Sequence, residues 1–137
     1  MDKIEAVTAV PSVNYENFQV LKYGVGQRYN VHHDYGADDV KLACGPRILT
    51  FFLYLSDVEE GGETAFPSLD IAVKPKKGRA LLWPSTLSDS PEEQDRRTFH
   101  EARPVIKGTK YAANAWIHMY NFMVPNLWGC TGAFDNL

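Results

Sequence analysis

The stretch RILTFFLYL, residues 47–55, decides the fold of this chain. It is nearly continuous in apolar residues, which is typical of a β-strand covered on both faces. The sequence EEGGETAF follows at residues 59–66, and its two glycines indicate a tight turn into a second strand at residues 64–66. The centre of the protein is therefore predicted to be a β-sheet.

Further short strands are predicted on both sides of this stretch. An amphipathic helix is expected first, at residues 4–10, and it ends at Pro11. Segment 85–98, rich in Ser, Glu, Asp and Arg, has no hydrophobic period and is expected to be an exposed loop. Many short strands without an internal repeat favour a mainly β jelly roll. The other expected strands, separated by Gly and Pro, span residues 18–23, 29–35, 71–74, 79–83, 101–106 and 110–120.

Length and composition describe an ordinary globular domain. The 137 residues, 45% of them hydrophobic, are expected to form one domain. The net charge of -3 and the lack of a sustained basic stripe argue against nucleic acid as a partner. No apolar stretch is long enough to span a membrane, and MDKIEAVTAV at residues 1–10 lacks the shape of a secretory signal. We therefore expect a soluble chain, in the cytoplasm or the endoplasmic reticulum lumen, whose Cys44 and Cys130 are free thiols.

Two histidines and one aspartate form a candidate metal site. If residues 29–35 form a strand, the side chains of His32 and Asp34 project from the same face, about 7 Å apart at the backbone. His33 would then point away, and His100 could supply a second imidazole. Two neutral imidazoles and one carboxylate are typical of non-haem Fe(II) oxygenases, although zinc is a rival and an isolated His-x-Asp pair is more often a surface pair.

The last predicted strand has two unlike faces. Lys110, Asn114 and Trp116 alternate with apolar or aromatic residues, so one face is mixed and the opposite face is uniformly apolar or aromatic. A buried lysine is costly unless an anion pairs with it. The mixed face is therefore the one expected to line a site for an anionic ligand.

Four separated blocks, in this order, closely resemble the prolyl 4-hydroxylase branch of the 2-oxoglutarate and Fe(II)-dependent dioxygenases. The resemblance extends from about residue 2 to residue 120. The blocks are FQVLKYGVGQRYNVHHDY (18–35), RILTFFLYLSDVEEGGETAFP (47–67), AVKPKKGRALLW (72–83) and HEARPVIKGTKYAANAWIH (100–118).

This resemblance implies a double-stranded β-helix, a cupin-like jelly roll, with the metal inside the mouth of the barrel. His32, Asp34 and His100 would be the catalytic Fe(II) ligands, and Lys110 would bind the distal carboxylate of 2-oxoglutarate. The remaining implied co-substrate residues are the hydroxyl groups of Tyr23 and Thr64 and the ring of Trp116.

The resemblance also implies an activity and a substrate. Arg47 and Tyr29 would face a proline-rich peptide or protein, which would be hydroxylated at the 4-position of a prolyl residue. Fe(II) would be the cofactor, 2-oxoglutarate and O2 the co-substrates, succinate and CO2 the products, and ascorbate the reductant. Proline-rich peptides are preorganised in polyproline II, which lowers the cost of binding them.

The chain departs from the family in beginning almost at the helix before the first core strand. It is thus expected to be a minimal form or a fragment of the catalytic domain, which bears on peptide specificity more than on metal binding. The alternatives are a related oxygenase for a free amino acid, another side chain or a small molecule, and a non-catalytic jelly roll that binds peptide. The tail at residues 121–137 is expected to pack against the barrel or, alternatively, to bind a partner.

Overall fold

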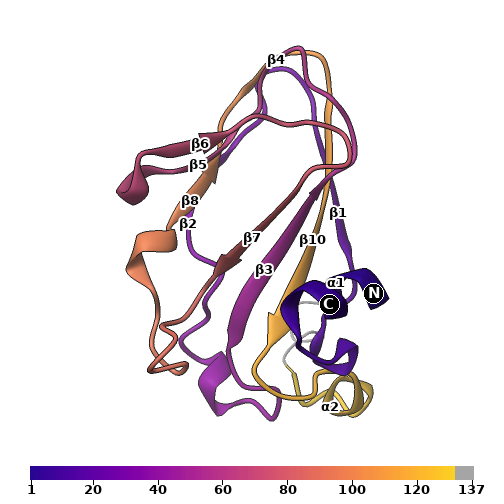
Figure 1. Ribbon diagram of the computed structural model, residues 1–137, viewed down its shortest axis with the longest axis vertical. Helices are drawn as coiled ribbons and strands as arrows, with labels where there is room; N and C mark the ends of the chain where they lie inside the picture. The colour runs from indigo at the N-terminus through magenta and orange to yellow at the C-terminus, as the bar shows by residue number, and fades with distance from the viewer. Residues whose placement is uncertain (132–137) are drawn as a thin grey trace.

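A computed structural model describes residues 1–131 of the chain, and Figure 1 shows the elements that position the site. The helices are α1 (Asp2–Thr8) and α2 (Met123–Leu127), and short 3-10 turns span Ser12–Asn14, Asp39–Lys41, Pro67–Leu69 and Arg96–Thr98. The strands are β1 (Gln19–Tyr23), β2 (Tyr29–His32), β3 (Arg47–Tyr54), β4 (Glu60–Gly61), β5 (Thr64–Phe66), β6 (Ile71–Val73), β7 (Ala80–Pro84), β8 (His100–Ala102), β9 (Val105–Lys107) and β10 (Lys110–His118).

Two four-stranded antiparallel sheets form the jelly roll that the sequence predicts. The larger sheet has the order β1-β10-β3-β7, and the smaller has the order β2-β8-β5-β6. A two-stranded ribbon of β4 and β9 lies where the two sheets converge (Figure 1). Strands that are neighbours in a sheet are mostly distant in the sequence, so residues from β2, β3, β8 and β10 can meet between the sheets.

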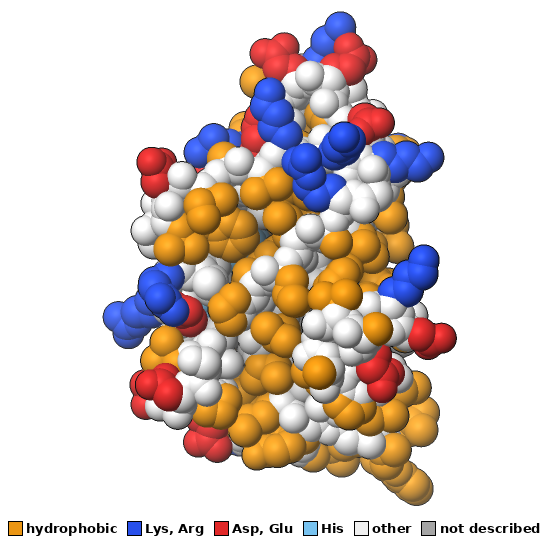
Figure 2. Space-filling model, in the orientation of Figure 1, with side chains coloured by type: hydrophobic (Ala, Val, Ile, Leu, Met, Phe, Trp, Pro, Cys, Tyr) orange, Lys and Arg blue, Asp and Glu red, His pale blue; other side chains and the backbone are white. Residues whose placement is uncertain are grey.

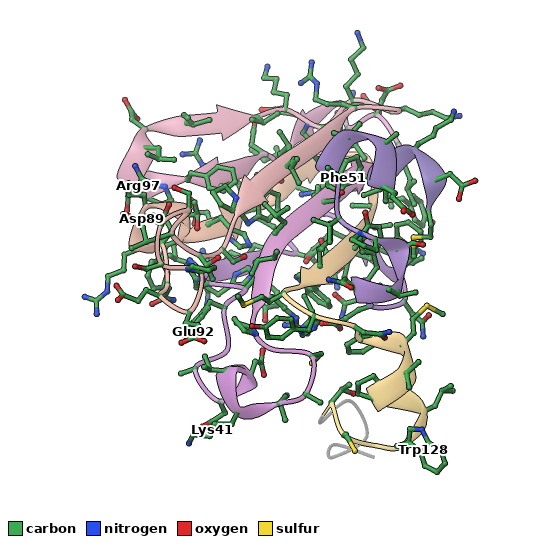
Figure 3. The ribbon with its side chains drawn as sticks, turned by 60° about the horizontal axis from the view of Figure 1, so that its bottom comes forward. Lys41, Phe51, Asp89, Glu92, Arg97 and Trp128 are labelled. Carbon is green, nitrogen blue, oxygen red and sulfur yellow. The ribbon has the colours of Figure 1, made fainter. Side chains whose placement is uncertain are left out.

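β3 is an interior strand with apolar neighbours on both faces, which confirms the interpretation of residues 47–55. Phe52 and Tyr54 face the inside of the barrel, where they pack with Phe66, Trp83 and Ala112. Phe51 faces the opposite way and packs with Ile4, Tyr15, Ala115 and Ile117, under the N-terminal helix (Figure 3). Apolar surface removed from water contributes about 25 cal/mol for each Å², so both clusters stabilise the fold.

Two predicted strands are wrong in their extent. The strand predicted at residues 29–35 ends at His32, because the backbone N–H of Tyr35 donates to His33 Nδ1 (2.9 Å) and bends the chain. The strand predicted at 101–106 is two strands, β8 and β9, that pair with different partners on either side of Pro104. Proline has no N–H to give to a ladder, so the sheet changes partner there.

The segment at residues 85–98 is not the fully exposed loop that its composition predicts. Its two ends are buried at Ser85, Thr86, Asp95 and Thr98. The carboxylate of Asp95 accepts hydrogen bonds from the backbone and side chain of Arg97, which orders the approach to β8. The ends of this segment therefore belong to the folded barrel.

The tail reaches the barrel through Phe122, which is buried and stacks on His118 with 5.0 Å between ring centroids. Beyond it, Leu127 and Trp128 are 82% and 80% exposed, and Trp128 points away from the barrel in Figure 3. The predicted packing is thus limited, and residues 132–137 of the tail lie outside the described residues.

Figure 2 shows hydrophobic side chains across the middle of one face and most charged side chains toward its margins. Leu82 on β7 and Val7 on α1 are among the exposed apolar residues. Within residues 1–131, no helix is long and apolar enough to cross a bilayer. Cys44 and Cys130 are free thiols, as the sequence predicts.

Candidate metal centre and its pocket

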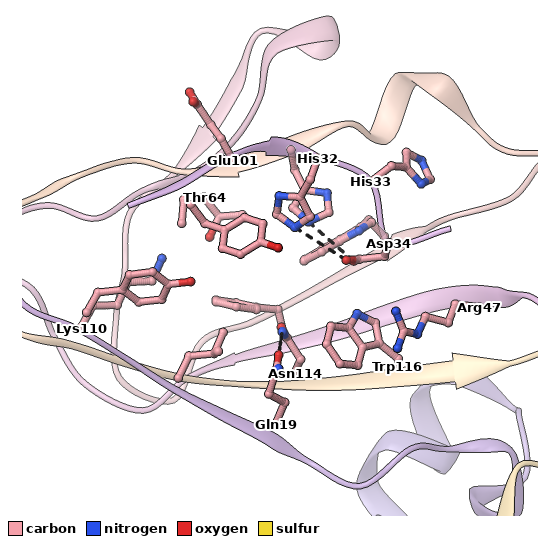
Figure 4. A pocket seen from close by; sticks show the side chains of 17 residues that line it. Gln19, His32, His33, Asp34, Arg47, Thr64, Glu101, Lys110, Asn114 and Trp116 are labelled. Carbon is pink, nitrogen blue, oxygen red and sulfur yellow. Dashed lines mark hydrogen bonds and ion pairs between the residues drawn. The ribbon is translucent and has the colours of Figure 1, made fainter. Parts of the chain in front are cut away.

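Three potential metal ligands converge between the two sheets (Figure 4). His32 ends β2, Asp34 lies in the following bend, and His100 begins β8 opposite His32. Nε2 of His32 is 3.8 Å from Asp34 Oδ1, and Nε2 of His100 is 3.6 Å from Asp34 Oδ2. One potential ligand atom from each residue lies within 4.8 Å of the others, so a single metal ion can be shared.

Backbone carbonyl groups orient both imidazole rings. His32 Nδ1 is 2.8 Å from the carbonyl oxygen of Asn30, and His100 Nδ1 is 2.9 Å from that of Thr98. With the proton on Nδ1, each Nε2 keeps its lone pair for a metal, as is usual for ligating histidines. Burial lowers the pKa of His100, against the opposing effect of Asp34, and favours its neutral form.

The donor set fits Fe(II). Two imidazoles and one carboxylate occupy one side of a metal and leave the remaining positions open. Zinc accepts the same ligands, so the donor atoms alone leave zinc as a rival. The whole pocket has a volume of about 280 Å³, and its other lining residues provide the chemistry that distinguishes an oxygenase from a zinc site.

Lys110 provides a buried cation at one end of this pocket. The residue is 1% exposed, and its Nζ has no hydrogen-bond partner within the described part of the chain. The rings of Tyr23, Phe52 and Tyr54 lie 5.4 to 5.6 Å from Nζ, and burial lowers the pKa of Lys110 to about 8. An unpaired buried ammonium is costly, so this end of the pocket fits an anionic ligand such as a carboxylate.

Hydroxyl groups surround the lysine. Tyr54 donates to Thr64 Oγ1 (2.7 Å), so the proton of the Thr64 hydroxyl is free for another acceptor. Tyr23 stands opposite Lys110 in the register of β1 and β10 and also lines the pocket. Burial raises the pKa of both tyrosines, which keeps them neutral hydrogen-bond donors.

A second charged group lies at the other end of the pocket. The Arg47 guanidinium lies 4.1 Å from the ring centroid of Trp116 and binds Glu16, with Nε 2.5 Å from Oε1. Nε2 of His118 is 2.8 Å from the same oxygen. Burial opposes the ionisation of Glu16, but hydrogen bonds to His118 and Arg47 outweigh it and lower the Glu16 pKa. Arg47 is thus fixed along the wall rather than extended into solvent.

Tyr29 and His33 flank the candidate ligands. Tyr29 is 53% exposed, and its ring centroid lies 4.1 Å from that of His32, at the mouth of the pocket. His33 Nε2 lies 2.9 Å from the Asp95 carbonyl oxygen and 3.0 Å from Thr98 Oγ1. His33 therefore has a structural role beside the site and is not one of the three converging ligands.

All nine candidate residues named from the sequence lie at or beside this pocket, although the structure adds others. Four residues that support the site were not predicted from the sequence. Thr50 and Tyr54 bond to Asp34 and Thr64, Glu16 binds Arg47, and His118 bonds to Glu16. The missing signal was parity within β3, where Thr50, Phe52 and Tyr54 share the inner face. A threonine and a tyrosine on the same face of an otherwise apolar strand indicate that this face contributes to a polar site and not only to the hydrophobic core.

Comparisons with known proteins agree with this site. A family model described as the 2OG-Fe(II) oxygenase superfamily matches residues 18–118. Prolyl 4-hydroxylase 2 of Arabidopsis thaliana is 41% identical over 143 residues, covering 88% of this chain and 47% of that protein. Prolyl 4-hydroxylase subunit alpha-1 of Gallus gallus is 39% identical over 121 residues, covering 85% of this chain and 23% of that protein. This chain thus spans less than half the length of both relatives.

A solved structure provides a three-dimensional match. The viral collagen prolyl hydroxylase of Paramecium bursaria Chlorella virus-1, in complex with 2OG, is 34% identical with a TM-score of 0.72. The match covers 85% of this chain and 71% of that one. The similarity therefore includes the barrel as well as the sequence blocks.

Proposed function

Because this chain belongs to the prolyl 4-hydroxylase family of the 2-oxoglutarate and Fe(II)-dependent oxygenases, we propose that it hydroxylates prolyl residues in peptides or proteins. The hydroxyl group would enter at the 4-position, and ascorbate would be the reductant. The preferred substrates would be proline-rich segments, whose polyproline II conformation is largely formed before binding.

The observation that carries this proposal is the buried Lys110 at one end of a pocket that holds two histidines and an aspartate at its centre. A buried cation without a partner has no role in a structural zinc site. A dicarboxylate such as 2-oxoglutarate would use both features, because one carboxylate would reach Lys110 while the other end approached the metal ligands.

His32, Asp34 and His100 would hold Fe(II). Together with 2-oxoglutarate, the bound metal supplies the chemistry, in which O2 and a C–H bond are converted to an alcohol while 2-oxoglutarate becomes succinate and CO2. The protein contributes binding and orientation. Lys110 would pair with the distal carboxylate, and the free proton of Thr64 would donate a hydrogen bond to it. The buried aromatic rings around Lys110 would keep water from competing for that carboxylate.

The substrate would occupy the opposite, more open end. Tyr29 and the stacked pair of Arg47 and Trp116 form two sides of this opening. Aromatic rings favour the flat face of a prolyl ring, and a fixed guanidinium can donate to a peptide carbonyl group. Because Arg47 is already held by Glu16, little conformational freedom would be lost when peptide binds.

The test is to incubate the chain with Fe(II), 2-oxoglutarate, ascorbate and air in the presence of a panel of proline-rich peptides and free proline. Mass spectrometry would follow the substrates, and succinate would be measured in parallel. Addition of one oxygen atom to a peptide prolyl residue, dependent on 2-oxoglutarate, is the expected result. If a free amino acid or another small molecule, and not a peptide, stimulated succinate formation, the substrate would belong to that class instead. If no substrate led to succinate formation, the proposal would be contradicted.

A further inference from the structure

Thr50 makes the only hydrogen bond from another side chain to Asp34 within the described residues. Thr50 lies at the centre of β3, is fully buried, and its Oγ1 is 2.6 Å from Asp34 Oδ2. An ionised carboxylate can only accept hydrogen bonds, so the threonine hydroxyl is the donor. One oxygen of the candidate metal ligand is therefore already engaged before any metal binds.

The two carboxylate oxygens of Asp34 would otherwise be nearly equivalent toward a metal. Oδ1 is 3.8 Å from His32 Nε2, and Oδ2 is 3.6 Å from His100 Nε2. Carboxylates bind metals through one oxygen or through both. The position of Asp34 between the two imidazoles permits either mode, and the bond from Thr50 is what makes its oxygens different.

We propose that Thr50 is a positioning residue that restricts Asp34 to binding the metal through a single oxygen. This inference rests on the proposed function, which needs open metal positions for a co-substrate and for O2. Three single-atom protein ligands leave half of an octahedral set open. A second oxygen from Asp34 would take one of those positions and compete with 2-oxoglutarate.

The surroundings of Thr50 allow its hydroxyl to be removed with little change of shape. In the register of the larger sheet, Thr50 stands between Trp83 on β7 and Trp116 on β10. Valine has the same branching as threonine and is well suited to a strand. Thr50→Val thus removes the hydrogen bond and keeps the packing, whereas Thr50→Ser keeps a hydroxyl donor.

The experiment uses Co(II) in place of Fe(II), because the Co(II) d–d absorption bands respond to changes in the ligands and their geometry. The purified parent and its variants are titrated first with Co(II) and then with 2-oxoglutarate. Thr50→Val should bind Co(II) as tightly as the parent or more tightly, but bind 2-oxoglutarate at least about tenfold more weakly. Its Co(II) spectrum should differ from that of the parent before 2-oxoglutarate is added, and Thr50→Ser should resemble the parent.

Thr86→Val is the matched control, because Thr86 is also a buried threonine, whereas Thr50 is the one whose hydroxyl donates to Asp34. It should leave both titrations unchanged. If Thr50→Val does not fold, Thr50→Ala removes the same hydroxyl and carries the same expectation.

Two results would overturn the inference alone. Thr50→Val could bind 2-oxoglutarate as the parent does, with the same Co(II) spectrum, or it could lose Co(II) affinity while its Co(II)-loaded form binds 2-oxoglutarate normally. The second result would mean that the hydroxyl only holds Asp34 in place. A parent protein that binds Co(II) but not 2-oxoglutarate would overturn the proposed function as well.

Discussion

Replacing Lys110 with methionine should make the protein more stable and, at the same time, unable to bind 2-oxoglutarate tightly. Burial lowers the pKa of Lys110 from 10.5 to about 8. Each tenfold change in proton affinity corresponds to about 1.4 kcal/mol, so keeping this ammonium charged in the folded protein at neutral pH costs about 3 kcal/mol. Methionine keeps most of the apolar stem and adapts to the surrounding rings. Lys110→Met should therefore raise the free energy of unfolding by up to about 3 kcal/mol.

The size of this stability difference depends on pH in a defined way. Between pH values of about 8 and 10.5, the unfolded chain binds a proton at Lys110 that the folded chain does not bind. The stability of the parent therefore rises with pH in this window, and the advantage of Lys110→Met shrinks. Urea unfolding of both proteins below and above this window measures the difference. Lys107→Met is the control, because Lys107 is exposed and its salt bridge to Glu59 lies at the surface.

The affinity for 2-oxoglutarate should fall in Lys110→Met, although its stability rises. Loss of one member of a buried charge pair costs about 2 to 5 kcal/mol, which corresponds to a loss of 2-oxoglutarate affinity from about 30-fold to several thousandfold. Calorimetric titration of the Mn(II)-loaded proteins measures it, and Mn(II) affinity should be nearly unchanged. A Lys110→Met protein that is clearly less stable than the parent, or that binds 2-oxoglutarate equally well, would refute the assignment of Lys110 as a cation that awaits an external anion.

Other changes test the remaining parts of the pocket. Asp34→Ala removes the anionic metal ligand and should lower Mn(II) affinity by at least about 100-fold in calorimetry; an unchanged affinity would place the metal elsewhere. The affinity of the parent for 2-oxoglutarate should fall by up to about tenfold for each pH unit above about 8, as Lys110 loses its proton, whereas a constant affinity up to pH 10 would mean that its charge is not used. Tyr54→Phe removes the donor to Thr64 and should weaken 2-oxoglutarate binding about fivefold, and a larger loss with altered unfolding would indicate a core role instead. Arg47→Ala should raise the KM for peptide and leave 2-oxoglutarate affinity unchanged, and the reverse pattern would move Arg47 to the co-substrate side.

Strong local signals made much of the fold predictable. The apolar run that became β3 and the Gly-Gly turn before β5 indicate their structures directly, and the strand at residues 64–66 has the predicted bounds. Alternation in β10 correctly separates the pocket-lining face of Lys110 from the face that packs under α1. The resemblance to a known family added the double-stranded β-helix, which local patterns do not contain.

Features that depend on tertiary contacts were not predictable in this way. The bend that moves Asp34 off the end of β2 depends on a hydrogen bond between the ring of His33 and the backbone of Tyr35. The burial of Asp95 and Thr98 depends on their contacts with each other and with His33, which a polar composition conceals. Thr50 has no motif of its own, and its contact with Asp34 joins residues 16 positions apart.

The measurement that tests the central claim most directly is a reaction under 18O2 with a proline-rich peptide, Fe(II), 2-oxoglutarate and ascorbate. Succinate and peptide would both be analysed by mass spectrometry. We expect one 18O atom in succinate and one in a 4-hydroxyprolyl residue, formed in equal amounts and absent with Asp34→Ala. Hydroxylated peptide without labelled succinate, or equal product from Asp34→Ala, would contradict it.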